Sequence, residues 1–272
     1  MADRESDSVF SGEAAELYEA LLVPLIFEPY AADLARRLSG LDSGAILEVA
    51  AGTGVVTRAL ASALSATVAL TATDLNQPMI DRAISVGTAR PVRWEQADVL
   101  SLPYERASFD VVVCQFGVMF FPATTKAFAE VHRVLRPGGQ FLFNVWDRIE
   151  DNEFAEVVTQ AVSSLFPADP PLFLRRTPHG YHDPEVIRAD LRAGGFDSDV
   201  RIEPVEARSR AATADAVAIA YCQGTPLRDE IETRGAGRLA DATAVASDAL
   251  ANRFGPTDLD GRIRAWVITA IR

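Results

Sequence analysis

The residues best suited to chemistry in this chain of 272 residues begin with a glycine-containing turn. The segment 47–54, LEVAAGTG, sets Gly52 and Gly54 between a short apolar run and a stretch with helical spacing. Glycine lets the backbone pass close beneath a ligand and adopt angles that other residues resist. A tight strand-to-helix turn without a ligand also explains the two glycines, so this motif alone is weak evidence.

Two aspartates follow the turn at positions that suit a nucleoside. Asp74 ends the next apolar run, twenty residues after Gly54, and a carboxylate there can accept hydrogen bonds from both hydroxyls of a ribose. Asp98 follows a third run, where its carboxylate can accept the adenine amino group and the Val99 N–H can donate to the ring. Each aspartate has an ordinary alternative, Asp74 as a helix N-cap and Asp98 as a turn residue. The three features in this order favour a cofactor that contains adenosine.

The sequence lacks one residue that a dinucleotide-binding fingerprint requires. Its third glycine would fall at Thr57 and is absent. The chain also offers no plausible Tyr/Lys or His/Asp set for hydride transfer. A methyl donor is therefore favoured, and a nicotinamide-dependent oxidoreductase stays open as an alternative.

An alternation of strand-like and helix-like segments positions these residues. Five strands separated by helix-length segments predict a parallel sheet with right-handed crossovers. Ligands of such sheets bind beyond the carboxyl ends of the strands, where Gln115 and Trp146 join the turn and the two aspartates. The expected strands are 45–49, 67–73, 92–96, 109–115 and 140–146, and the expected helices are 57–64, 78–85 and 126–135, the last stopping at the RPGG of 136–139.

The flanking segments predict helical additions to this sheet. Residues 13–40 indicate two short helices, because Pro24 and Pro29 interrupt the helical spacing. We expect an N-terminal helical cap at 1–44 and one domain at 45–272 with helical insertions at about 151–183 and 213–258. The latter insertion serves equally well as a dimer surface or as an intramolecular lid. Further expected elements are helices at 184–193 and 213–253 and an antiparallel pair of strands at 200–205 and 263–271.

The composition and charge of the chain limit the kinds of partner that the protein can bind. The net charge is −12, from 26 Lys+Arg against 38 Asp+Glu, and no basic cluster is long enough to bind nucleic acid. The two cysteines, Cys114 and Cys222, form neither a metal-ligand spacing nor a disulfide framework. The chain shows no secretory signal and no apolar stretch of the roughly 18 residues that cross a bilayer. We therefore expect a cytoplasmic protein with no bound metal, no nucleic-acid partner and no stable membrane insertion.

Four segments together resemble a known family. They read LEVAAGTG, ATDLNQPM, QADVLSLPYERASFDVVVCQFGVMFF and VHRVLRPGGQFLFNVW. In this order they resemble the class I S-adenosylmethionine methyltransferases, in the group of small-molecule enzymes related to the ubiquinone/menaquinone C-methyltransferases. The resemblance covers about 45–147. It implies a Rossmann-like α/β fold, doubly wound, with a mostly parallel seven-stranded sheet and an antiparallel last strand. It also implies that S-adenosyl-L-methionine is the cofactor and methyl transfer the reaction.

The resemblance also implies which residues hold the cofactor. Glu48 orders the turn, Asp74 holds the ribose, and Asp98 with Val99 reads the adenine. The family often has glycine where Ala50 and Ala51 stand, so a slightly different loop is expected. The remaining implied residues are Gly52, Gly54, Leu75, Asn76, Met79, Gln115 and Phe116.

A general base and an acceptor pocket leave weaker signals. His179, Tyr181 and His182 lie in RTPHGYHDP, within an insertion that could roof the acceptor, although a structural role explains them too. His132 is expected to be a surface or packing residue, and Tyr18 either closes over the cofactor or simply packs.

The acceptor itself is indicated only by composition. No Asn-Pro-Pro follows the fourth strand, which argues against an adenine or glutamine-amide acceptor. A small, apolar or aromatic metabolite is favoured, and a non-catalytic member that binds the cofactor or a partner is the third hypothesis. The apolar residues considered for the pocket are 116–121, which core packing explains equally well, and Phe154, Leu165, Phe166 and Phe173.

Overall fold

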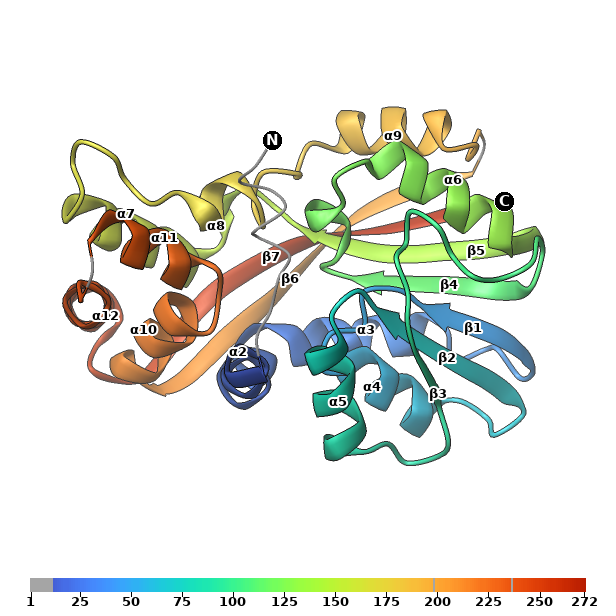
Figure 1. Ribbon diagram of the computed structural model, residues 1–272, viewed down its shortest axis with the longest axis horizontal. Helices are drawn as coiled ribbons and strands as arrows, with labels where there is room; N and C mark the ends of the chain where they lie inside the picture. Colours follow the sequence, from blue (N-terminus) through green and yellow to red (C-terminus); the bar gives the residue numbers. More distant parts are fainter. Residues whose placement is uncertain (1–11, 198, 236) are drawn as a thin grey trace.

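A seven-stranded sheet in the order β3-β2-β1-β4-β5-β7-β6 forms the centre of the protein (Figure 1). The computed structural model describes residues 12–197, 199–235 and 237–272. The first five strands pair in parallel, and β7 runs antiparallel between β5 and β6. The predicted sheet and its reversed last strand are confirmed. The strands are β1 (Gly44–Glu48), β2 (Val68–Asp74), β3 (Arg93–Gln96), β4 (Phe109–Gln115), β5 (Leu135–Trp146), β6 (Val200–Thr213) and β7 (Thr257–Ile271).

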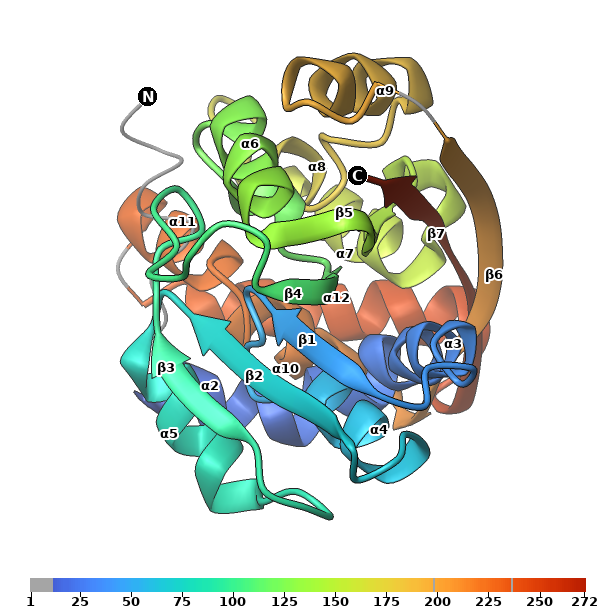
Figure 2. The same cartoon turned by 90° about the vertical axis from the view of Figure 1, so that its right-hand side faces the viewer.

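Helices cover both faces of this sheet (Figures 1 and 2). The central strand β4 reads FDVVVCQ and is buried along Val111–Cys114, as a strand covered on both faces must be. On one face lie α3 (Glu28–Arg37), α4 (Val55–Ala63) and α5 (Gln77–Val86). On the other lie α6 (Thr124–Val134) and α9 (Pro184–Ala193).

A second group of helices lies beyond the ends of β6 and β7, to one side of the sheet (Figure 1). The rings of Phe154 and Phe254 pack edge-on with their centroids 5.0 Å apart, and this contact connects the first of these helices to the last. Three helices of this group separate the last two strands in the chain. We call this group the helical cluster; its members are α7 (Glu153–Ser164), α8 (Phe173–Arg176), α10 (Ala214–Gln223), α11 (Leu227–Arg234) and α12 (Leu239–Phe254).

The N-terminal segment differs from the prediction of two short helices. It is helical without a break through α2 (Gly12–Leu17), η1 (Tyr18–Phe27) and α3. Proline has no N–H to complete an α-helical hydrogen bond. Around Pro24 the chain instead adopts the wider π-helical turn, in which the Glu28 N–H reaches the carbonyl of Val23.

Several element ends also differ from the prediction. The strand after RPGG begins earlier than expected, at Leu135, because the Gly138 N–H donates to the Arg272 carbonyl and the Arg272 N–H to Gly139. The strand expected at 200–205 extends to Thr213, because β7 pairs with it along its whole length. Two short 3-10 helices, η2 (Val118–Phe120) and η3 (Ile149–Asp151), follow β4 and β5. No helix in the described part of the chain is long and apolar enough to span a membrane.

Candidate active site

A cavity of about 430 Å³ opens above the carboxyl ends of β1 and β4, where the strand order reverses. The sheet forms its floor, and η1 and the helical cluster form its walls. This volume lies within the range of roughly 300–1,000 Å³ that is usual for small-molecule sites. Among the residues that sequence reasoning named, those that line it are Tyr18, Ala50, Gly52, Asp74, Leu75, Asn76, Met79, Asp98, Val99, Gln115, Phe116, Gly117, Phe120, Phe121, Trp146, Phe173 and His179.

The glycine turn borders the cavity, and three of its residues have a left-handed backbone conformation. Ala50, Gly52 and Gly54 have φ of +53°, +56° and +85°. Glycine adopts these angles freely, whereas alanine at Ala50 is strained. A Cβ at Gly54 would lie 2.8 Å from the Trp94 ring, so this glycine serves close packing behind the turn. Ala51 also faces away from the cavity, and its N–H donates to the Thr73 carbonyl at 2.9 Å.

Asp74 ties the glycine turn to the end of β2. Its Oδ2 accepts the Gly52 N–H and its Oδ1 accepts the Asn76 N–H, both at 2.8 Å. Oδ1 accepts a second, longer hydrogen bond from Asn76 Nδ2 at 3.4 Å, so Oδ2 is the oxygen that keeps a lone pair for a hydroxyl of a ligand. Burial raises the pKa of Asp74, while these backbone hydrogen bonds oppose the rise. The N-cap residue of α5 is Asn76, which excludes the alternative of Asp74 as that cap.

Glu48 lies behind the turn and does not line the cavity. Its carboxylate accepts a hydrogen bond from the Thr57 hydroxyl at 2.5 Å, and its carbonyl accepts one from Thr73. Burial raises the pKa of Glu48 to about 8. Thr57, at the position of the missing third glycine, thus anchors α4 to β1.

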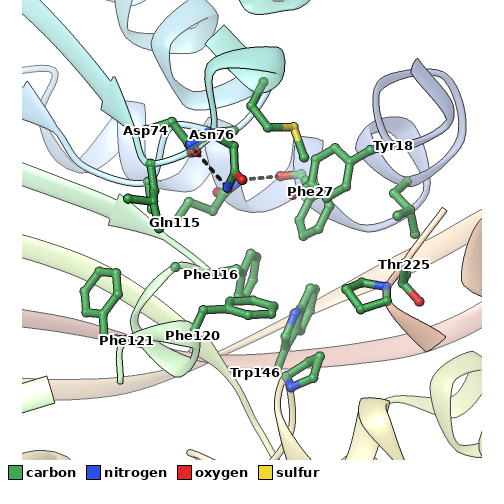
Figure 3. A pocket seen from close by; sticks show the side chains of 18 of the residues that line it. Tyr18, Phe27, Asp74, Asn76, Gln115, Phe116, Phe120, Phe121, Trp146 and Thr225 are labelled. Carbon is green, nitrogen blue, oxygen red and sulfur yellow. Dashed lines mark hydrogen bonds between the residues drawn. The ribbon is translucent and has the colours of Figure 1, made fainter. Parts of the chain in front are cut away.

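The polar half of the cavity is completed from β3 and β4. Asp98 is exposed at the rim, and its Oδ1 accepts the Leu100 N–H at 2.8 Å. Gln115 donates through Nε2 to the Phe27 carbonyl at 3.3 Å. Its Oε1 is buried and has no partner among the described residues, so it can accept a hydrogen bond from a cationic ligand group. Figure 3 shows Asp74, Asn76 and Gln115 together on one side of the cavity.

Aromatic rings line the opposite half (Figure 3). Phe116 has a left-handed φ of +50°, and its N–H donates to the Asn144 side chain at 2.9 Å. Its ring stacks on Trp146 with centroids 3.8 Å apart and planes within 6°. We call this the aromatic half; its rings are Phe27, Phe116, Phe120, Phe121, Trp146 and Phe173.

The three weak candidates for a general base differ in whether they line the cavity. His179 lines the cavity, and its ring centroid lies 5.9 Å from that of Trp146. Tyr181 and His182 do not line the cavity. The Tyr181 hydroxyl donates to Asp190 at 2.8 Å, and Nδ1 of His182 lies 2.8 Å from the His179 carbonyl.

The state of the His179 ring follows from its surroundings. Its Nδ1 lies 2.8 Å from the Asp147 carbonyl, which can only accept, so the proton is on Nδ1. Burial lowers the pKa of His179 to about 4, which keeps the ring neutral near pH 7. His132, by contrast, lies on α6 and packs edge-on against Phe196, as expected.

Some apolar predictions were wrong, and some lining residues were missed. Phe154, Leu165 and Phe166 lie outside the cavity and pack within the helical cluster. Val118 and Met119 pack in the core, which is the alternative that their sequence pattern left open. Ala97, Leu100 and Pro122 adjoin predicted residues, whereas no local signal pointed to the other missed residues, which come from η1, from α8 and α10, and from distant loops and strands. They are Leu22, Ile26, Phe27, Ala97, Leu100, Pro122, Asn152, Leu174, Pro178, Tyr221, Gly224, Thr225, Pro226 and Ile263.

Comparison with known proteins bears on what this cavity holds. The family model described as a methyltransferase domain matches residues 47–143. The ubiquinone/menaquinone biosynthesis C-methyltransferase UbiE of Ectopseudomonas mendocina (strain ymp) is 30% identical over 175 residues, which cover 59% of this chain and 68% of the relative. The enzyme of the same name from Brucella anthropi is 36% identical over 108 residues, covering 38% of this chain and 41% of the relative.

Two solved structures share the fold. Phosphoethanolamine N-methyltransferase 2 of Haemonchus contortus, in complex with phosphomonomethylethanolamine and S-adenosylhomocysteine, matches with a TM-score of 0.59 and 19% identity over 96% of this chain and 57% of its own. The YcgJ protein of Bacillus subtilis matches with a TM-score of 0.57 and 19% identity over 90% of this chain and 98% of its own.

The residues present fit the cofactor of these relatives. The lone pair left on Asp74 Oδ2 suits a ribose hydroxyl, and the unpaired Oε1 of Gln115 suits an ammonium group. The domain match, the UbiE relationship and the shared fold agree with this geometry. The chain belongs to the class I S-adenosylmethionine-dependent methyltransferases, related to UbiE, and its cofactor is S-adenosylmethionine.

Proposed function

We propose that this enzyme methylates a small, apolar or aromatic metabolite bound in the aromatic half of the cavity, with the cofactor in the polar half. The observation that carries the proposal is the distribution of charge along the wall. The charged carboxylates of the described lining, Asp74 and Asp98, both belong to the polar half. The aromatic half offers ring faces and a neutral imidazole, His179.

The lining favours an uncharged acceptor. No described lining residue is Arg or Lys, so a phosphorylated acceptor would lose its water without gaining an ion pair. An aromatic ring, in contrast, gains roughly 25 cal/mol for each Å² of apolar surface buried. The printed name of the UbiE relatives refers to quinone biosynthesis, which also supports a ring-containing acceptor.

The residues of the chain act by positioning and by excluding water. When bound, the cofactor supplies an electrophilic methyl group on a positively charged sulfur. The rings of Phe116 and Trp146, held by the Asn144 contact, would orient the acceptor at the boundary of the two halves. Such positioning can supply roughly 7–11 kcal/mol of a reaction barrier. Tyr18, on η1, would cover the cofactor from above, and the site roles of Ala50 to Gln115 stay part of this proposal.

Transfer of a labelled methyl group from S-adenosylmethionine tests the proposal. The acceptor panel contains uncharged aromatic compounds, aliphatic amines and phosphoethanolamine. We expect labelled product only with aromatic members. We also expect Trp146→Ala to reduce that product by about tenfold or more, because it removes half of the stacked pair. Transfer confined to amines or phosphorylated compounds would contradict the proposal.

A further inference from the structure

The aromatic half contains a hydroxyl that the protein leaves unsatisfied. Tyr221, on α10, is 4% exposed and lines the cavity. Its hydroxyl makes no hydrogen bond to any described residue, whereas those of Tyr30, Tyr104 and Tyr181 each donate to an oxygen. The side chain is buried but its hydroxyl reaches the cavity, where a polar group is normally hydrogen-bonded to water or to a ligand. The natural partner of Tyr221 is therefore a group that enters the cavity.

A second polar atom in this half has the opposite character. Because Nδ1 of His179 donates to the Asp147 carbonyl, Nε2 carries a lone pair and accepts hydrogen bonds. The ring lies beside Trp146 and is neutral. Tyr221 thus provides a donor and His179 an acceptor. The lining also includes Asn152 and Thr225, whose side chains already donate to backbone carbonyls, and the other neighbours are aromatic and aliphatic.

We propose that Tyr221 and His179 determine specificity by recognising a neutral hydroxyl group on the acceptor. Tyr221 donates a hydrogen bond to the oxygen of that hydroxyl, and His179 Nε2 accepts a hydrogen bond from its O–H. This inference rests on the proposed function and names the chemistry of its acceptor more narrowly. A carboxylate would face the lone pair of His179, and an ammonium group, which has no lone pair, would leave the Tyr221 proton without an acceptor. A hydroxyl satisfies both atoms at once, because it donates and accepts.

A pair of ring compounds that differ by one hydroxyl tests the inference. The full-length protein is saturated with S-adenosylhomocysteine, and its affinities for 2-naphthol and naphthalene are measured by equilibrium dialysis. We expect 2-naphthol to bind at least about tenfold more tightly, since a site that offers hydrogen bonds rejects a ligand that cannot form them. The variants Tyr221→Phe and His179→Asn should each lose most of this preference while keeping the affinity for naphthalene. Asparagine can still donate to the Asp147 carbonyl but lacks Nε2.

Tyr104→Phe is the matched control, because its hydroxyl donates to Glu95 outside the cavity. It should keep the full preference. Tyr221→Phe should also melt at the same temperature as the parent or higher, since no internal hydrogen bond is lost. A lower melting temperature would overturn the inference by showing that the hydroxyl has a structural partner.

The two proposals fail in different ways. Equal affinity of the parent protein for both compounds overturns the hydroxyl inference and leaves the aromatic acceptor intact. Binding of neither compound contradicts the aromatic acceptor itself, and the inference with it. A preference that survives in Tyr221→Phe and His179→Asn also overturns the assignment of these two residues.

Discussion

Two strained residues stand at the ends of neighbouring parallel strands. Ala50 follows β1 and Phe116 follows β4, both with φ near +50°, and both line the cavity. Left-handed backbone at a non-glycine residue is costly and tends to occur at functional sites. A Cβ at Gly117 would lie 2.6 Å from that of Ala50, so the two strand ends meet closely there. The sequence indicated the turn but not this conformation, which depends on contacts between the strands.

Replacing Ala50 by glycine should relieve strain. We expect Ala50→Gly to keep or raise the free energy of unfolding, by up to about 1 kcal/mol. Ala51→Gly is the control, because Ala51 is buried without a positive φ, and it should lose about 1 kcal/mol. Urea unfolding of both variants measures the difference. Equal losses would show that the Ala50 backbone is not strained.

Asp74 should be the residue most sensitive to a change of charge. Asp74→Asn keeps the size of the side chain but weakens the acceptor for the ribose hydroxyls. We expect the dissociation constant for S-adenosylhomocysteine to rise by about tenfold to a hundredfold, as for a lost charge-assisted hydrogen bond. The control Asp81→Asn, which changes an exposed contact with Gln77 on α5, should bind normally. Unchanged affinity of Asp74→Asn in calorimetry would refute the ribose assignment.

His179 should make stability depend on pH. Its pKa is about 4 in the folded protein against 6.5 for an ordinary histidine, so the folded state binds fewer protons between these values. Its contribution is present above pH 6.5 and is lost as the pH falls toward 4, by about 3 kcal/mol in total. Urea unfolding of the parent and of His179→Asn at pH 7.5, 6 and 5 measures this effect. The advantage of the parent should shrink as the pH falls, and a constant difference would contradict the neutral assignment.

At the scale of elements, the strands and helices of the sheet could be predicted where local pattern and tertiary packing agree. The run VVVC in β4 is apolar because both faces are covered, so its bounds matched the prediction. The second half of β6 reads ARSRAAT and is poor in β-branched and aromatic residues, so it does not indicate a strand by itself, and pairing with β7 makes it one. The helix at Pro24 continues through a π-helical turn, which the proline signal alone did not predict.

An ion pair connects η1 to the glycine turn. Arg58 donates to Glu19 on η1 at 2.7 Å and to the Thr53 carbonyl at 2.6 Å. We expect Arg58→Met to increase amide hydrogen exchange in η1 and to weaken S-adenosylhomocysteine binding by about tenfold, because Tyr18 would be held less firmly. Arg36→Met is the control, since Arg36 is mostly exposed and pairs with Asp33 within α3. Equal protection of η1 in both variants would exclude this role.

At the scale of the whole molecule, the cavity is assembled from parts that lie far apart in the chain. The polar half comes from strand ends between Ala50 and Gln115, which is why the family motifs predicted its residues. The opposite wall takes Phe27 from η1, Tyr221 from α10 and Ile263 from β7. These residues have no shared motif, and only the folding of the helical cluster over the sheet brings them together. The part of the aromatic half that comes from η1, α10 and β7 therefore could not be predicted from the sequence.

The position of the nucleoside tests this division of the cavity most directly. A crystal structure of the protein with S-adenosylhomocysteine should show the ribose hydroxyls on the Asp74 carboxylate. The adenine should lie beside Asp98, and the sulfur should point toward Phe116 at the border of the aromatic half. Adenine seated among the aromatic rings, or a ribose that makes no contact with Asp74, would contradict the account.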